Sequence, residues 1–194
     1  MYWQVYLHKT SVSAERMMVN LIKRAQYLAQ SGESLNGTDA LKLFLRHNPT
    51  IEEFKEKPQV LQAYGELDDN DIWGAIKLWK NHSDPILSSL CQMILSRNLF
   101  QIWLAAEPIK KMQVDKVRAE VSKKYKVLRG DASFLFSHGV VSNEAYVAEG
   151  QTINVLMKSG EVIDIAQASD LPSIKAISKI VKKNYLCWPK NVYL

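Results

Sequence analysis

The sequence has 194 residues, of which 47% are apolar and 23% are charged, and its formal net charge at pH 7 is +5. No segment approaches the roughly 20 consecutive apolar residues of a membrane-spanning helix, and the start lacks the basic leader and the cleavage site of a signal peptide. We therefore expect a cytoplasmic chain that folds as one globular domain or two small ones.

The first predicted element is an amphipathic helix that runs from residue 1 to a break at Ser31-Gly32. No Ser, Thr, Asp or Asn precedes its first turn, where a helix usually has a capping side chain. The missing cap predicts a chain truncated at its N-terminus, and a frayed natural end is the alternative. The apolar residues at helical spacing are Val5, Val12, Met17, Leu21, Ala25 and Leu28.

Shorter helices are predicted up to residue 97 from their capping signals. Thr50 and Glu53 have the spacing of a capping box, and Pro85 follows Asp84 at the first helical position. The capping candidates are Thr38, Thr50, Asp84 and, for one further helix, Asp68, Asp69 or Asn70. The helix after Asp68 is expected to bury Ile72, Trp73, Ile76 and Trp79.

From residue 98 onward, strand signals alternate with helical ones. Strands are predicted over 99–104, 134–136, 153–157, 162–165 and 185–188. Gly160 separates two of them and can adopt the positive φ of a tight hairpin turn. A basic helix is expected to direct Val114, Val117, Val121 and Leu128 inward, and a last helix is expected over 172–183.

The order of these elements predicts an α+β fold. An all-α array over residues 1–97 is expected to precede an α+β subdomain over residues 98–194. The sheet of this subdomain is expected to be small and mostly antiparallel, with helices on one face, and a ferredoxin-like arrangement is one form that it can take.

Positive charge is concentrated between residues 107 and 130. This segment has eight basic and three acidic residues, a surplus of five that equals the net charge of the whole chain. Such a segment can attract nucleic acid or nucleotide phosphates. A solvated helix face is the favoured interpretation, because no aromatic residues alternate with the lysines as a base-stacking surface requires. Nucleic-acid binding stays open as the alternative.

No residue pattern predicts a catalytic centre or a metal site within this chain. There is no glycine-rich phosphate loop and no nucleophile elbow. Asp68, Asp69 and Asp71 stand where carboxylates cap a helix N-terminus. Cys91 and Cys187 are expected to be buried reduced thiols rather than a disulfide. The four histidines share no metal-binding spacing; they are His8, His47, His82 and His138.

The opening helix has the side chains best suited to bind a ligand. Tyr6 and Lys9 lie three residues apart and are expected on one face, whereas His8 is about 200° around the helix from Tyr6. A tyrosine can stack on or hydrogen-bond a sugar or base, and a lysine offers a point charge for phosphate. An interfacial tyrosine and a surface lysine are the alternative, since such pairs are common.

Three short segments resemble the HD-domain phosphohydrolases of the deoxynucleoside triphosphate triphosphohydrolase type, in the part that follows the metal site. They are Val5-Tyr6-Leu7-His8-Lys9-Thr10, then Leu67-Asp68-Asp69 leading to Ile72-Trp73, then Ser96-Arg97-Asn98-Leu99-Phe100. Their order and approximate spacing match over residues 2–103, and the resemblance extends more loosely beyond. It implies that Tyr6 and Lys9 contact the substrate nucleotide, and that His8 and Lys9 approach a regulatory nucleotide.

The same resemblance implies a metal-dependent hydrolysis whose metal ligands lie upstream in such proteins. Those ligands include an adjacent His-Asp pair, and this sequence contains no His-Asp doublet. We therefore expect a substrate-positioning and assembly portion without catalytic residues, metal or cofactor of its own, the divalent metal belonging to the parent protein. The expected partners are a nucleotide and further copies of the chain, and no membrane. A stand-alone nucleic-acid-binding module and a structural oligomerisation module are the alternatives.

Overall fold

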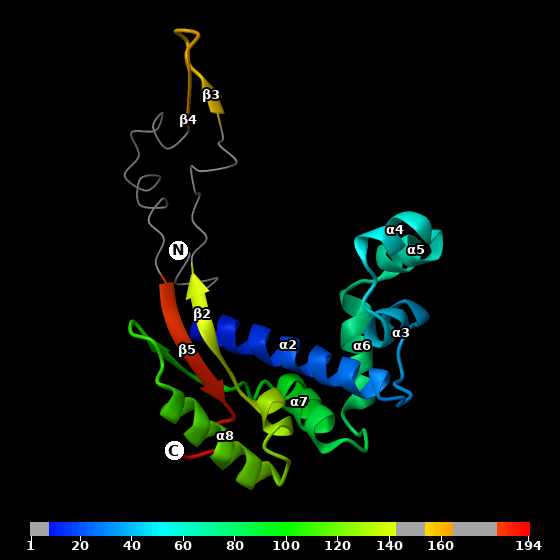
Figure 1. The fold of residues 1–194 in the computed structure, drawn as a ribbon, viewed down its shortest axis with the longest axis vertical. Coiled ribbons are helices and arrows are strands. Elements are labelled where there is room, and N and C mark those ends of the chain that lie inside the picture. Colours follow the sequence, from blue (N-terminus) through cyan, green and yellow to red (C-terminus); the bar gives the residue numbers. More distant parts are fainter. Residues whose placement is uncertain (1–7, 143–153, 165–181) are drawn as a thin grey trace.

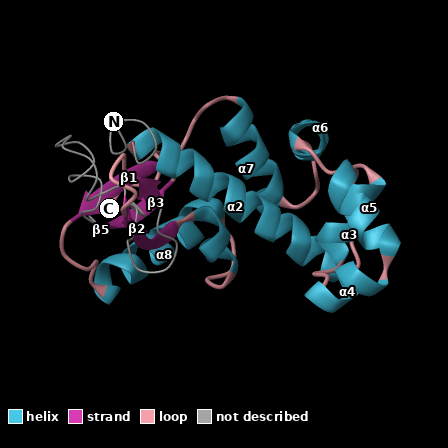
Figure 2. Cartoon of the chain, turned by 90° about the horizontal axis from the view of Figure 1, so that it is seen from above, coloured by secondary structure: helices cyan, strands magenta, loops and turns pink. Residues whose placement is uncertain are grey.

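A helical array and a small sheet lie at opposite ends of one long helix, α2 (Lys9–Gln30), in both Figure 1 and Figure 2. The computed structural model describes residues 8–142, 154–164 and 182–194. Within these ranges no helix is long and apolar enough to cross a membrane. The further helices of the described part are α3 (Asp39–Arg46), α4 (Ile51–Glu56), α5 (Pro58–Glu66), α6 (Asp69–Trp79), α7 (Pro85–Leu95), α8 (Lys111–Tyr125) and the short 3₁₀ helix η1 (Asp131–Leu135).

The main sheet has three antiparallel strands. β1 (Gln101–Ala105) and β2 (Ser137–Ser142) both pair with β5 (Lys182–Trp188), in the order β1-β5-β2. Because β5 runs antiparallel to both, β1 and β2 are parallel to each other, and the connection between them includes α8. This split β-α-β unit is an element of the ferredoxin-like arrangement. The predicted α+β fold, with helices first and a small antiparallel sheet after them, is confirmed.

A separate hairpin confirms the predicted turn at Gly160. β3 (Asn154–Leu156) pairs with β4 (Val162–Asp164), and Gly160 has the positive φ of 87° that favours glycine. The last helix, predicted over 172–183, falls mostly outside the described residues. Its final two positions, Lys182 and Lys183, belong instead to β5, where they pair with β2.

The predicted helix starts are confirmed by their capping hydrogen bonds. The hydroxyl of Thr38 accepts a hydrogen bond from the N–H three residues later at 3.3 Å, and the carboxylate of Asp84 does the same at 2.7 Å. Thr50 and Glu53 form the predicted capping box. Of the three candidates at the start of α6, Asp68 is the cap, and its Oδ1 accepts from the N–H of Asn70 at 2.7 Å and from that of Asp71 at 3.3 Å. These contacts satisfy backbone donors that the helices leave unpaired.

The strand predicted over 134–136 is wrong. Asp131–Leu135 is a 3₁₀ helix, and the strand begins one residue after Phe136. The Ser133 hydroxyl donates to the Gly130 carbonyl at 2.7 Å, and the Ser133 N–H also approaches that carbonyl at 3.2 Å. This local turn bonding outweighs the strand preference of the aromatic residues.

Two side chains predicted to be buried are exposed. Trp73 is 45% exposed because it lies about 100° around α6 from Ile72, at the edge of the buried stripe. Leu128 is 77% exposed because α8 ends before it, at Tyr125. Lys126 follows in the left-handed conformation, with φ 53°, which stops the helix.

One hydrophobic core includes residues of both the helical array and the α+β region. The two cysteines, Cys91 and Cys187, are free and buried in it, as predicted. The division into domains at residues 97 and 98 stays a prediction. Among the fully buried core residues are Met17 and Leu21 of α2, Leu90 of α7, Val117 of α8 and Leu186 of β5.

Candidate functional site

Two of the residues predicted to contact nucleotides, His8 and Lys9, lie at the start of α2, and the structure corrects their geometry. His8 is extended, with φ −61° and ψ 144°, so the helix predicted to run through residue 8 is wrong there and α2 begins at Lys9. The predicted absence of a cap is also wrong, because His8 Nδ1 accepts a hydrogen bond from the Thr10 N–H at 3.3 Å. Tyr6 lies outside the described residues. The angle of about 200° between Tyr6 and His8 no longer applies, since His8 is not helical.

Lys9 is exposed and begins a row of basic residues along α2. Lys9, Arg16 and Lys23 are spaced seven residues apart, which places them within about 20° of one direction and about 10 Å apart along the axis. The sequence analysis did not detect this row, although its seven-residue spacing was a usable signal. Arg16 and Lys23 line a pocket between α2 and elements of the α+β region.

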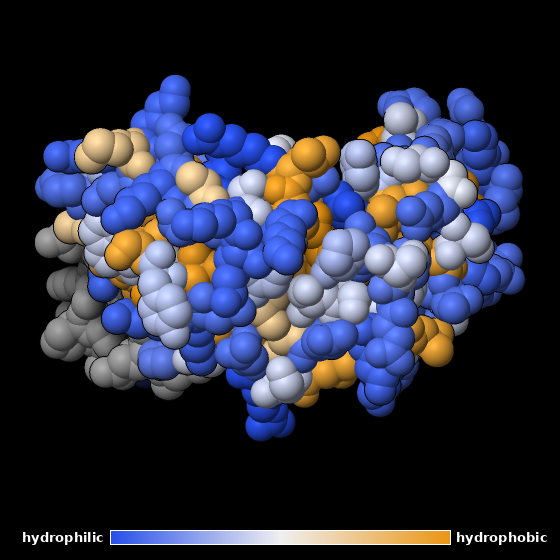
Figure 3. Space-filling view, turned by 90° about the horizontal axis from the view of Figure 1, so that it is seen from below, coloured by the Kyte–Doolittle hydropathy of each residue, from blue (hydrophilic) through white to orange (hydrophobic). Residues whose placement is uncertain are grey.

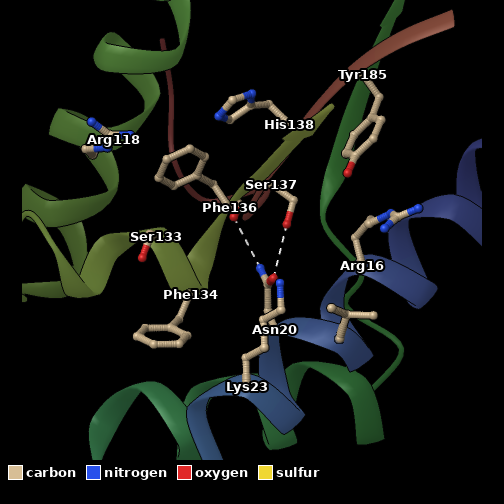
Figure 4. Close-up of a pocket in the computed structure, with 11 residues that line it drawn as sticks. Arg16, Asn20, Lys23, Arg118, Ser133, Phe134, Phe136, Ser137, His138 and Tyr185 are labelled. Carbon is tan, nitrogen blue, oxygen red and sulfur yellow. Dashed lines mark hydrogen bonds between the residues drawn. The ribbon is translucent and has the colours of Figure 1, made fainter. Parts of the chain in front are cut away.

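The pocket has a volume of about 320 Å³ and lies among α2, α8, η1, β2 and β5. Figure 4 shows Arg16 and Lys23 of α2, Arg118 of α8, and His138 of β2 around it, together with Tyr185 of β5. Of the basic segment between residues 107 and 130, only Arg118 lines this pocket. The lysines of α8 are exposed instead, at Lys111, Lys116, Lys123 and Lys124.

A pair of hydrogen bonds fixes β2 against α2 at the base of the pocket. Asn20, only 6% exposed, donates from Nδ2 to the Phe136 carbonyl at 3.2 Å, and the Ser137 hydroxyl donates to Asn20 Oδ1 at 3.2 Å. Figure 4 draws both bonds as dashed lines. The Asn20 amide is therefore a structural group that holds the pocket walls together.

Aromatic rings hold the two guanidinium groups of the pocket. Arg16 lies 5.3 Å from the centroid of the Tyr185 ring, and Arg118 lies 5.7 Å from that of Phe136, both within cation–π range. Burial raises the pKa of Tyr185, so that its hydroxyl stays neutral at physiological pH and can donate a hydrogen bond.

The charges around the pocket are only partly neutralised. Arg16 forms an ion pair with Glu15 at 3.1 Å, and Arg118 forms one with Asp115 at 3.2 Å. Each pair uses one of the five N–H donors of a guanidinium. Arg16 Nε is buried and has no hydrogen-bond partner among the described residues. No aspartate or glutamate is among the described residues that line the pocket, so it favours an anion.

The described ranges contain no group of three or more His, Cys, Asp or Glu residues that could hold a metal ion. The carboxylate of Asp68 caps α6, which agrees with the role that the sequence predicts for it. His82, another histidine without a metal spacing, accepts from the Asp84 N–H at 3.0 Å in the turn before α7. The predicted absence of a metal site from the whole chain stays a prediction.

Comparison with solved structures relates this fold to a phosphohydrolase. The chain superposes on the crystal structure of the phosphohydrolase BT4208 from Bacteroides thetaiotaomicron VPI-5482 with a TM-score of 0.83 and 38% sequence identity. The match covers 98% of this chain and 47% of that one. The chain is therefore similar, over nearly its whole length, to somewhat less than half of a phosphohydrolase.

Sequence comparison finds a second bacterial relative. The chain is 32% identical to the uncharacterized protein YwfO of Bacillus subtilis (strain 168) over 102 residues, which are 52% of this chain and 21% of that protein. No protein-family model matches the sequence. The chain thus spans about a fifth of this curated relative in the matched region.

Proposed function

We propose that the chain is the C-terminal, substrate-positioning and assembly portion of a metal-dependent HD-superfamily phosphohydrolase that acts on deoxynucleoside triphosphates or related phosphate esters. The similarity to BT4208 carries this proposal, because 38% identity with a TM-score of 0.83 relates the chain to a phosphohydrolase in both sequence and fold. The three segments that resemble the family support its finer terms.

The metal of such an enzyme would lie in the other part of the longer protein. The side chains of the described ranges do not fit it, since none of them form a group of three or more metal ligands. This chain would instead supply Tyr6 and Lys9 for the substrate. His8 and Lys9 would contact a regulatory nucleotide, although His8 also has a structural role as the cap of α2.

Exposed apolar side chains support the assembly role. The described helices α4, α5 and α6 leave several large apolar residues between 45% and 66% exposed. Figure 3 shows hydrophobic residues, in orange, exposed among hydrophilic ones on the face seen from below. A second polypeptide surface that covered them would remove this apolar area from water. These residues are Ile51, Leu61, Tyr64, Trp73 and Leu78.

Hydrolysis assays test the proposal. We expect the longer protein to release triphosphate from a deoxynucleoside triphosphate in the presence of a divalent metal, and the 194-residue chain alone to show no hydrolysis. The proposal also predicts that the coding sequence upstream of this chain continues in frame and encodes an adjacent His-Asp pair. Metal-dependent hydrolysis by the isolated chain, or an upstream sequence without such a pair, would contradict the proposal.

The exposed lysines of α8 keep nucleic-acid binding as the second candidate function. If these lysines form only a solvated face, the affinity for an oligonucleotide falls steeply between low and physiological salt. Such binding is driven by the release of counterions from the nucleic acid, and added salt opposes this release. Sequence-selective binding that persists at physiological salt would favour the nucleic-acid-binding module instead.

A further inference from the structure

We propose that the pocket among α2, α8, η1, β2 and β5 binds a small molecule that carries a phosphate group. None of the residues assigned above to substrate or effector lines this pocket. The proposal concerns binding by this chain and does not depend on the proposed hydrolase activity.

The charge of the pocket selects an anion. Arg16, Lys23 and Arg118 approach it from two different helices, α2 and α8. Arginine and lysine remain protonated at neutral pH, and a guanidinium offers a planar set of donors that matches phosphate oxygens. Glu15 and Asp115 each occupy only one end of their arginine partner. The remaining donors, with no carboxylate in the described lining, are available to phosphate oxygens.

Arg16, which lines the pocket, has an unused donor. Its Nε is buried from solvent and has no hydrogen-bond partner in the described part of the chain. Buried donors are nearly always paired in folded proteins, so an unpaired one at the wall of a pocket needs an explanation. Because this Nε has almost no accessible surface, a phosphate oxygen in the pocket would accept from its N–H only after the Arg16 side chain rotates.

The pocket walls are already arranged for binding. Tyr185 and Phe136 lie against the guanidinium groups of Arg16 and Arg118, and the Asn20 bonds hold β2 on α2. A ligand would therefore pay little of the entropy cost of ordering side chains. Because the arginines are fixed while Lys23 is exposed at the rim, we expect Lys23 to contribute by charge and the arginines by directed hydrogen bonds.

The size and the aromatic lining limit the ligand to a small molecule. The volume of about 320 Å³ is at the lower end of the roughly 300–1,000 Å³ that ligand pockets occupy. His138 stacks on Phe136 with 6.3 Å between ring centroids and an interplanar angle of 15°, which adds flat apolar surface beside the cations. A nucleoside phosphate or a short inorganic oligophosphate provides the required group.

Isothermal titration calorimetry of the 194-residue chain at physiological salt tests the proposal. Inorganic triphosphate and a deoxynucleoside triphosphate serve as separate probes. Tighter binding of the deoxynucleoside triphosphate than of inorganic triphosphate would assign a role to the aromatic rings of the pocket. We expect at least one probe to bind, and Lys23→Gln and Arg118→Gln each to weaken it by about tenfold. Lys77→Gln is the matched control, because Lys77 is exposed on α6, away from the pocket, and the variant loses the same charge as Lys23→Gln.

Lys23→Gln keeps the test independent of folding, since Lys23 is exposed and an unchanged thermal melting curve is expected. Three results would overturn the proposal. They are no binding of either probe at millimolar concentration, equal weakening by Lys23→Gln and Lys77→Gln, and tighter binding of a single-stranded oligonucleotide that depends on Lys123 and Lys124 rather than on Lys23. Each result leaves the hydrolysis assay of the longer protein unaffected, so the two proposals fail separately.

Discussion

Arg24 of α2 donates two hydrogen bonds to Asp84, from Nε to Oδ1 at 3.1 Å and from Nη2 to Oδ2 at 2.5 Å. The same carboxylate accepts from the Leu87 N–H at 2.7 Å and so caps α7. Arg24 Nη1 donates to Asp131 of η1 at 2.9 Å. One guanidinium thereby connects the long helix, the helical array and the α+β region, and both side chains of the Arg24–Asp84 pair are less than 10% exposed.

Arg24→Ala should lower the free energy of unfolding by about 3 kcal/mol, because it leaves the buried Asp84 carboxylate without its cation. Urea denaturation followed by circular dichroism measures this change. Arg46→Ala, at an exposed position on α3, is the control and should change stability by less than about 0.5 kcal/mol. Equal stability of Arg24→Ala and Arg46→Ala would show that the Arg24 network contributes nothing.

The pH dependence of stability should also reflect Asp84. Burial by itself would raise the pKa of Asp84, but the hydrogen bonds from Arg24 and the Leu87 N–H lower it below its ordinary value. A carboxylate with a lowered pKa stabilises the fold fully above its unfolded pKa of about 3.9 and loses this contribution as pH falls through the folded pKa. Unfolding free energies between pH 6 and pH 2.5 should therefore decrease less steeply in Asp84→Asn than in the unaltered chain; parallel curves would contradict this.

Capped helix starts and the hairpin turn could be predicted from the sequence, because the side chains that form them act on backbone groups a few residues away. Thr38, Asp84 and Gly160 act through neighbouring backbone groups, and all three have the predicted roles. His8 was missed as a cap because a histidine ring nitrogen seldom has that role. The segment 134–136 was misread because its apolar residues are contiguous, and contiguous residues do not distinguish a strand from a buried turn.

The pocket could not be predicted because four separate segments of the chain supply its walls. Arg16 and Arg118 are about 100 residues apart in sequence, and only the sheet pairing brings β2 and β5 beside α2. The row Lys9, Arg16 and Lys23 was the one local signal. The basic excess over residues 107–130 comes mainly from exposed lysines, and of this segment only Arg118 lines the pocket.

Thr38→Ala should lower the free energy of unfolding by about 1 kcal/mol, since the first turn of α3 loses the side-chain acceptor for one free N–H. Thr38→Ser retains a hydroxyl at the same place and should stay within a few tenths of the unaltered value. Thermal or urea unfolding of the two variants side by side provides the measurement. A serine variant as unstable as the alanine variant would assign the effect to the lost methyl group.

Both cysteines should be unreactive in the folded chain. Burial raises the pKa of Cys91 to about 12 and that of Cys187 to about 12, so almost no thiolate exists at pH 8. Titration with a thiol-reactive chromogenic disulfide should label neither residue in the native state and both after denaturation. Rapid native labelling of either cysteine would show that its part of the core opens readily.

In the parent enzyme that we propose, Tyr6→Ala should lower kcat/KM by about tenfold or more, which corresponds to at least ~1.4 kcal/mol of transition-state binding. Tyr6→Phe retains the ring and should separate stacking from the hydroxyl hydrogen bond. Lys9→Ala, if it acts through an effector, should raise the activator concentration required while leaving fully activated turnover nearly unchanged. Unaltered kinetics in a folded Tyr6→Ala protein would leave Tyr6 with a packing role only.

The central position of β5 sets the order in which a ribosome can complete this sheet. β1 and β2 each need β5 as their hydrogen-bonding neighbour, yet β5 is the last of the three to be synthesised. About 80 residues separate the end of β1 from the end of β5, so translation at roughly 5–20 residues per second takes on the order of 4–16 s to supply the missing strand. From the completion of β2 until β5 follows, the nascent chain has two strands without their central neighbour, and such unpaired edges favour aggregation at this stage of its biosynthesis.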